Sequence, residues 1–298
     1  MKIDKMNFKE IIQLFIPPIC YKAKKYLFPK PEREWNPLPK FSREGDKVII
    51  VGNGPSLNKT MELYDDMVRK APCMMVNFAA NTELYERIKP SIYLLVDPAW
   101  YNPTEKLQTI VESCIDAIVC KTVWPMTIVM PNRAKESHAV QRFKENANLR
   151  ILFYEDGWQL PKGMSKFEAW DKNLICPPAQ TVLNTAVWLS IYWGYKETYL
   201  IGADTSFIQD IYIGQKDNVL YTIDSHFYKN EDVYNSGLEP EKKGRKFGMD
   251  MEQLLESVYV MFKSYRELRE YAEWKGVKIY NASEYSMIDC LERKKLNV

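Results

Sequence analysis

The residues best suited to chemistry follow short apolar runs that are predicted to be strands. The run that ends at Val51 leads into Gly52-Asn53-Gly54-Pro55-Ser56, and later runs lead into Asn77, Asp97 and Asp204. Because ligands bind beyond the carboxyl ends of the strands in an open parallel sheet, we expect these side chains to lie at one edge. Amide, hydroxyl and carboxylate groups can bind ribose hydroxyls and the edge of a base. The pattern therefore predicts a nucleotide site.

The glycine loop is the stretch around which the rest of the chain is organised, although on its own it is of modest specificity. Gly52 and Gly54 can adopt dihedral angles closed to other residues and let a ligand approach the backbone closely. Pro55 suits the first turn of a helix, and Ser56 offers a hydroxyl and an N–H at a helix start, where backbone donors attract phosphate. An ordinary strand-to-helix turn is the alternative explanation. Leu57 stands where a dinucleotide motif needs its third glycine, and no GxxxxGK[ST] occurs, so NAD and P-loop chemistry are not expected.

The elements that must position these residues alternate between strand and helix. Strands are expected at 47–51, 73–78, 91–96, 116–120, 149–154, 197–202 and 277–281. A buried helix is expected over 181–193, and a longer one over about 250–275, where Asp250 and Gln253 form a capping-box-like start and Gly276 a stop. This alternation predicts an α/β fold, Rossmann-like, with a mostly parallel sheet and helices on both faces.

Two further regions flank or interrupt the expected domain, which spans 41–298. Residues 1–40 form an amphipathic segment and a proline-rich linker, and residues from about 204 to 248 form an irregular, lid-like insertion. The N-terminal segment is too short and interrupted to span a bilayer, and it lacks a signal-peptide cleavage site. Two interpretations stay open: a helix at an anionic membrane interface, or a helix packed on the domain.

Composition limits the classes of binding partner and the cellular compartment that we expect. A net charge of +2 over 298 residues gives no reason to expect nucleic-acid binding. The six cysteines are scattered without a CxxC pair, and Cys73 and Cys120 lie in strand-like apolar runs, where thiols behave as small hydrophobes. We therefore expect no metal site and a cytoplasmic protein, with peripheral contact at the inner face of the plasma membrane if the N-terminal segment binds lipid. The sequence is compatible with an oligomer.

Three segments carry a resemblance to known families: Val48-Ile-Ile-Val-Gly-Asn-Gly-Pro-Ser56, Gly194-Tyr-Lys-Glu-Thr-Tyr-Leu-Ile-Gly-Ala-Asp204 and Ser225-His226-Phe227-Tyr228. Together they resemble the bacterial sialyltransferases that decorate lipooligosaccharide from CMP-linked sialic acid. The first two also resemble the broader MptE-like domain, which includes 6-hydroxymethylpterin diphosphokinases and flagellin glycosyltransferases. The similarity covers roughly residues 46 to 230.

The resemblance implies roles for individual residues. His226 would be the general base that deprotonates the acceptor hydroxyl, which a histidine can do near neutral pH without a metal, and Tyr212 would hydrogen-bond the departing phosphate. A solvated loop residue is the alternative for His226. The expected nucleotide- and donor-binding residues are Gly52, Asn53, Gly54, Ser56, Asn77, Asp97, Thr181, Asp204, Thr205 and Ser206.

The chain departs from the sialyltransferase pattern where the donor sugar would bind. Val182 and Leu183 follow Thr181 in place of serine and glycine, Asp97 replaces an asparagine, and Thr205-Ser206 replace an aromatic pair. An ionised Asp97 would repel an anionic sugar. The comparison therefore supports nucleotide binding more strongly than it supports specificity for sialic acid.

The leading hypothesis is a metal-independent glycosyltransferase of surface-polysaccharide assembly. It would transfer a sugar from a nucleotide donor, with CMP as the expected nucleotide, to a glycan or lipid-linked glycan acceptor, and it would need no further cofactor. One alternative is a pterin-type diphosphokinase that uses ATP and magnesium held by Asp97 and Asp204. Another is a non-catalytic relative that binds a nucleotide without turnover.

Overall fold

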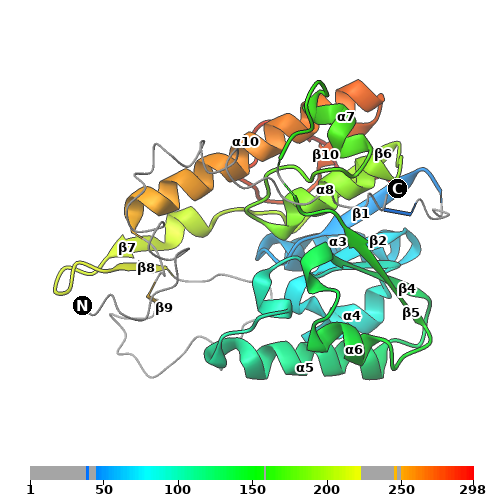
Figure 1. Cartoon of the computed structure of the whole chain (residues 1–298), viewed down its shortest axis with the longest axis horizontal. Coiled ribbons are helices and arrows are strands. Elements are labelled where there is room, and N and C mark those ends of the chain that lie inside the picture. Colours follow the sequence, from blue (N-terminus) through cyan, green and yellow to red (C-terminus); the bar gives the residue numbers. More distant parts are fainter. Residues whose placement is uncertain (1–37, 40–44, 158, 223–244, 247–249) are drawn as a thin grey trace. The chain divides into compact units, whose positions relative to one another are not determined.

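A parallel sheet organises the part of the chain that we describe, from a computed structural model that places residues 38–39, 45–157, 159–222, 245–246 and 250–298. The chain divides into two units, Met1–Asn36 and Pro37–Val298, and all of these residues belong to the second. The strand order is β11-β10-β6-β1-β2-β3-β4-β5 (Figure 1). The strands are β1 (Lys47–Val51), β2 (Cys73–Val76), β3 (Ile92–Leu94), β4 (Met126–Pro131), β5 (Leu149–Tyr154), β6 (Glu197–Ile201), β10 (Lys278–Asn281) and β11 (Glu292–Arg293).

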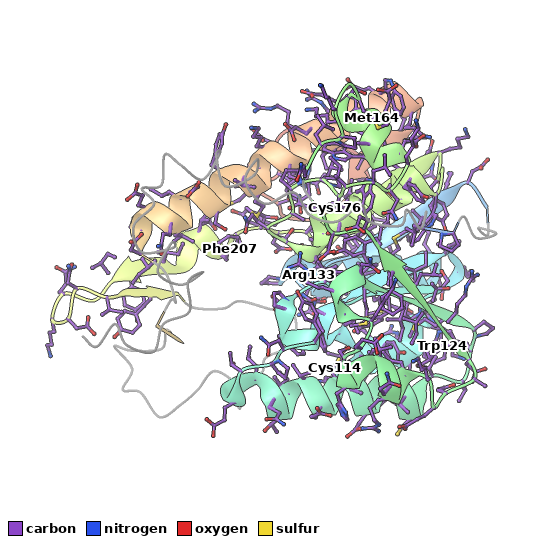
Figure 2. All side chains as sticks on the ribbon, in the orientation of Figure 1. Cys114, Trp124, Arg133, Met164, Cys176 and Phe207 are labelled. Atoms are coloured by element: carbon purple, nitrogen blue, oxygen red, sulfur yellow. The ribbon has the colours of Figure 1, made fainter. Side chains whose placement is uncertain are left out.

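Helices cover both faces of this sheet, because successive side chains of each strand point to opposite faces. Val48 and Ile50 of β1 belong to the core under α7, α8 and α10, whereas Ile49 and Val51 belong to the core over α3 to α6. The labelled side chains of Met164 and Cys176 lie on the first side and Cys114 on the second (Figure 2). The helices are α3 (Ser56–Lys70), α4 (Glu83–Ile88), α5 (Glu105–Lys121), α6 (His138–Phe143), α7 (Lys166–Asp171), α8 (Val182–Tyr192) and α10 (Met251–Lys275). The predicted Rossmann-like α/β fold is confirmed.

One predicted strand is wrong. Residues 116–120 form the last turns of α5, and Cys120 is exposed on that helix rather than buried in a strand. The apolar residues of α5 recur every three or four positions, which buries one face of a helix. The strand of this region is β4, which pairs in parallel with β3 and β5. A short apolar run does not distinguish a buried strand from a buried helix, which explains the error.

The two predicted helices that flank the site are confirmed. The α8 helix begins after Thr181. In α10 the Asp250 side chain accepts from the Gln253 N–H, and the Gln253 side chain accepts from the Asp250 N–H, which is the predicted capping box. The helix ends at Gly276 with φ of 68°, a left-handed conformation that glycine adopts without strain.

The expected irregular insertion contains ordered structure. After the short helix η5 (Phe207–Asp210), the strands β7 (Ile211–Ile213), β8 (Leu220–Thr222) and β9 (Arg245–Lys246) form a small antiparallel sheet, and β8 contacts η5. His226 and residues 1–37 lie outside the described residues, so the predictions about them stay predictions. Among the described helices, none combines the length and apolar character needed to cross a bilayer.

Candidate functional site

The site lies where the strand order reverses. The chain builds β1 to β5 toward one edge of the sheet and then returns to place β6 against the other side of β1. Loops that leave two adjacent strands at such a point create a crevice at their carboxyl ends, where ligands of open α/β sheets bind. Here those loops are residues 52–55 after β1 and 202–206 after β6 (Figure 1).

The glycines of these two loops are held against each other. The Gly52 N–H donates to the Ile201 carbonyl oxygen (2.8 Å), and the Gly54 N–H donates to the Gly202 carbonyl oxygen (2.8 Å). A β-carbon on Gly52 would come within 2.9 Å of the Gly202 carbonyl carbon, and one on Gly54 within 2.5 Å of the Asp204 carboxyl carbon. The close backbone approach that we expected a ligand to make is therefore made by the protein itself.

Asp204 occupies the start of α3. The Ser56 N–H donates to Asp204 Oδ2 (2.9 Å), and the Ser56 hydroxyl donates to Asp204 Oδ1 (2.6 Å). Burial raises the pKa of this carboxyl, and the hydrogen bonds from Ser56 partly oppose that rise. A phosphate at this helix start would have to displace the carboxylate or bind beside it. The geometry gives no support to the phosphate that we expected here.

The asparagines after β1 and β2 are different, because each holds a buried acceptor without a partner. Asn53 Nδ2 donates to the Val76 carbonyl oxygen (3.2 Å), which fixes the orientation of the amide and leaves Oδ1 buried and unpaired among the described residues. Asn77 has φ of 51°, and its Oδ1 is likewise buried and unpaired. A buried polar group without a partner costs about 1–3 kcal/mol. Each of the two oxygens can accept a hydrogen bond from a donor that approaches it.

A third group of polar side chains comes from the start of α8, from the loop after β6 and from α10. Tyr265 of α10 is buried, and its hydroxyl lies near Thr181 and Thr205 without a hydrogen bond of normal geometry; burial raises its pKa to about 12. Thr205 has φ of 55°, a strained conformation for a β-branched residue. These contacts bring the predicted residues Thr181 and Thr205 together.

Asn184, in the first turn of α8, is a residue that the sequence reasoning missed. Its side chain is fully buried, and the Thr181 hydroxyl lies 3.4 Å from Oδ1 while Nδ2 has no partner among the described residues. Whichever way the amide is turned, Thr181 pairs with only one of its polar atoms. The available signal was an amide side chain within an otherwise mostly apolar helix. The neighbouring Leu183 would lie 3.2 Å from a β-carbon on Gly52, so this turn of α8 adjoins the end of β1.

The remaining predicted residues are not joined to this group by any described contact. Asp97 is exposed, and its carboxylate accepts from the Ala99 N–H (2.8 Å) at the start of η3 (Pro98–Trp100). Tyr212 lies in β7 and stacks on Tyr221, with ring centroids 5.4 Å apart. Ser206 immediately precedes η5. Within the described part of the chain, no group of three or more His, Cys, Asp or Glu side chains could hold a metal ion.

A family model described as 6-hydroxymethylpterin diphosphokinase MptE-like matches residues 29–210, which is more than half of the chain. The protein belongs to the MptE-like family. The matched range includes the loops after β1, β2 and β6, and so contains both asparagines with unpaired acceptors. The narrower sialyltransferase resemblance is not confirmed by this match.

Two other comparisons add little to the family assignment. No curated protein matches this MptE-like chain. Among solved structures, that of MAf glycosyltransferase from Magnetospirillum magneticum AMB-1 matches with 13% sequence identity and a TM-score of 0.48. The alignment covers 87% of this chain and 35% of that one, so this chain spans about a third of that protein's length. At this distance the likeness carries no inference about activity.

Proposed function

We propose that this MptE-like protein is a glycosyltransferase that binds a nucleotide sugar, with CMP as the nucleotide, beyond the carboxyl ends of β1 and β2. Family membership and the switch point between β1 and β6 support a ligand site at this edge. The observation that carries the proposal is the pair of buried, unpaired amide oxygens on Asn53 and Asn77. Their partner must present hydrogen-bond donors.

The chemistry of the nucleotide follows from those acceptors. An exocyclic amine, such as that of cytosine, offers two N–H donors, and ribose offers two hydroxyls. Uracil has a carbonyl oxygen at the position of the cytosine amine and would face an acceptor with an acceptor. CMP therefore fits the two asparagines better than UMP does.

The proposed transfer needs a base and a group that stabilises the leaving phosphate. The acceptor hydroxyl attacks the anomeric carbon of the donor, the bond from that carbon to the phosphate oxygen breaks, and CMP leaves. His226 takes the proton of the acceptor hydroxyl, and Tyr212 donates to the departing phosphate. The acceptor is a glycan or a lipid-linked glycan, and no metal or other cofactor takes part in this mechanism.

Calorimetric titration with CMP, UMP and 2′-deoxy-CMP tests the nucleotide assignment. CMP should bind more tightly than UMP by about fivefold or more, since one good hydrogen bond contributes about 1 kcal/mol. Asn77→Gly should weaken CMP binding. Asn173→Gly is the matched control, because Asn173 has the same φ of 51° but lies away from β1, with its Oδ1 already accepting from the Glu155 N–H (3.1 Å). Failure of CMP to bind, or unchanged affinity in Asn77→Gly, would overturn the assignment.

The family description itself favours a second candidate, a pterin-type diphosphokinase that uses ATP and magnesium. That activity would assign the metal to Asp97 and Asp204, yet both carboxylates already accept hydrogen bonds at helix starts. Chelation separates the two candidates. Glycosyl transfer from a CMP-sugar should persist in EDTA, whereas ATP-dependent diphosphate transfer should stop.

A further inference from the structure

The outward face of α10 carries a pattern that neither the nucleotide site nor the core explains. Leu255 and Tyr259 are each 60% exposed, and Met251 is 39% exposed. Large apolar side chains gathered on one helix face commonly mark an interaction surface. α10 lies in the outer helical layer of this unit, so its outward face is free of the sheet (Figure 1).

The charged residues of this face form one stripe, which is acidic at its N-terminal end and basic at its C-terminal end. Glu252, Glu256, Tyr259, Lys263 and Arg266 are spaced by four, three, four and three residues, which places them along one line of the helix. The acidic pair lies on the N-terminal side of Tyr259 and the basic pair on the C-terminal side, at nearly equal distances. No described ion pair engages any of these four charges.

A second copy of the same helix, run antiparallel about a two-fold axis through Tyr259, would match this stripe. Residues whose numbers sum to about 518 would then lie opposite each other. Glu252 would face Arg266 of the other copy, and Glu256 would face Lys263, over a stretch of about 21 Å at 1.5 Å per residue. Leu255 would fall near Phe262 of the other copy.

A cavity lies where that Leu255 would arrive. It has a volume of about 460 Å³, and its lining combines apolar and charged side chains: Tyr259, Phe262, Lys263 and Arg266 of α10, with Met287, Asp289 and Cys290. Each copy therefore offers both an exposed apolar side chain and a recess beside Phe262 to receive it, as an isologous interface requires.

We propose that the protein forms a two-fold dimer through antiparallel pairing of α10 with α10 of a second copy. The acidic half of each stripe pairs with the basic half of the other, and Leu255 enters the cavity of its partner. The four charged side chains of the stripe are not among the residues proposed to bind the nucleotide, so the pairing can be tested apart from that chemistry.

Charge reversal on the full-length chain tests this pairing. One variant, E252R/E256K, makes the stripe wholly basic, and another, K263E/R266E, makes it wholly acidic. In sedimentation velocity the wild type should be a dimer, and each variant alone should be a monomer because like charges now face each other. An equimolar mixture of the two variants should restore the dimer, since every basic side chain then meets an acidic one.

The control reverses the same number of charges elsewhere. E62K/D66K alters two exposed acidic residues of α3 and should leave the dimer intact. Circular dichroism should show native helix content in all variants, since the changed side chains are exposed. A monomeric wild type, a dimer that survives both reversals, or variants that fail to associate with each other would each overturn the proposal.

Discussion

The polar groups on the two sides of β1 differ in whether they have hydrogen-bond partners within the protein. Toward β6, the N–H groups of Gly52 and Gly54 and the carboxylate of Asp204 all have protein partners. Toward β2, Asn53 and Asn77 keep buried oxygens without any described partner. The comparison teaches that the glycine motif, the most conspicuous feature of the sequence, is accounted for by packing between two strands. The asparagines are not accounted for by the fold, and they are the better guide to a ligand.

The largest expected effect on stability comes from a substitution that disrupts the packing on the β6 side of β1. Gly54→Ala would drive a β-carbon into the Asp204 carboxyl group and to 2.8 Å from the Gly202 carbonyl oxygen. Because the obstruction includes backbone, we expect the free energy of unfolding to fall by about 3 kcal/mol. Urea denaturation measures this change.

Gly163→Ala provides the control for that substitution. Gly163 has φ of 77°, and a β-carbon there would meet no atom within 4 Å. Alanine should therefore lower the free energy of unfolding only by the cost of holding a residue with a side chain in the left-handed conformation, about 1–2 kcal/mol. If Gly54→Ala proved as stable as wild type yet failed to bind CMP, the space beside Gly54 would belong to a ligand and the comparison between the two sides of β1 would fail.

The strands that the sequence predicted well each correspond to a single, mostly apolar run. The run at 47–51 matched β1 at both ends, since a strand buried on both faces reads as a continuous apolar segment. The run at 149–154 matched β5 at both ends, although β5 is an edge strand that is only partly buried. Residues 116–120 looked the same over five positions. Only the wider spacing of apolar residues along α5 shows that they belong to a helix.

The candidate site was predictable only where it depends on strand ends. Asn53, Asn77 and Asp204 follow strands, and the rule that ligands bind at carboxyl ends was enough to select them. That rule could not reveal that Asp204 caps α3, because the partner Ser56 is 148 residues away in sequence. Tyr265 was missed for the same reason, since packing of α10 against the α8 region brings it to Thr181 and Thr205.

A smaller effect on stability is expected from removing the unpaired amide on the β2 side of β1. Asn77→Gly removes a buried acceptor without a partner and relaxes a residue with φ of 51°. We expect stability to stay the same or rise by about 1 kcal/mol, while CMP binding weakens.

Asn173→Gly should behave in the opposite way. It relaxes the same φ but removes the hydrogen bond from the Glu155 N–H, so stability should fall by about 1 kcal/mol with CMP binding unchanged. Thermal or urea unfolding of the two variants side by side provides the measurement. A loss of stability in Asn77→Gly equal to that in Asn173→Gly would show that the Asn77 oxygen has a structural partner.

The smallest effect is a difference in pH dependence at Asp204. Burial raises the pKa of this carboxyl in the folded protein above the ordinary value of 3.8, despite the hydrogen bonds from Ser56. The folded state therefore holds its proton more tightly than the unfolded state does. This contribution to stability is fully present below the unfolded pKa and is lost as pH rises through the folded pKa. Asp204→Asn has no such proton.

The free energy of unfolding of wild type minus that of Asp204→Asn should therefore decline as pH rises from 3.8 toward neutrality and then level off. Urea denaturation of both proteins across that range measures the difference, and titrations of the other carboxyl groups cancel in it. If the difference grew with pH instead, the hydrogen bonds from Ser56 and the N-terminus of α3 would outweigh the desolvation of the carboxylate. The β6 side of β1 would then be a preformed anion site occupied by Asp204, and an incoming phosphate would compete with that side chain directly.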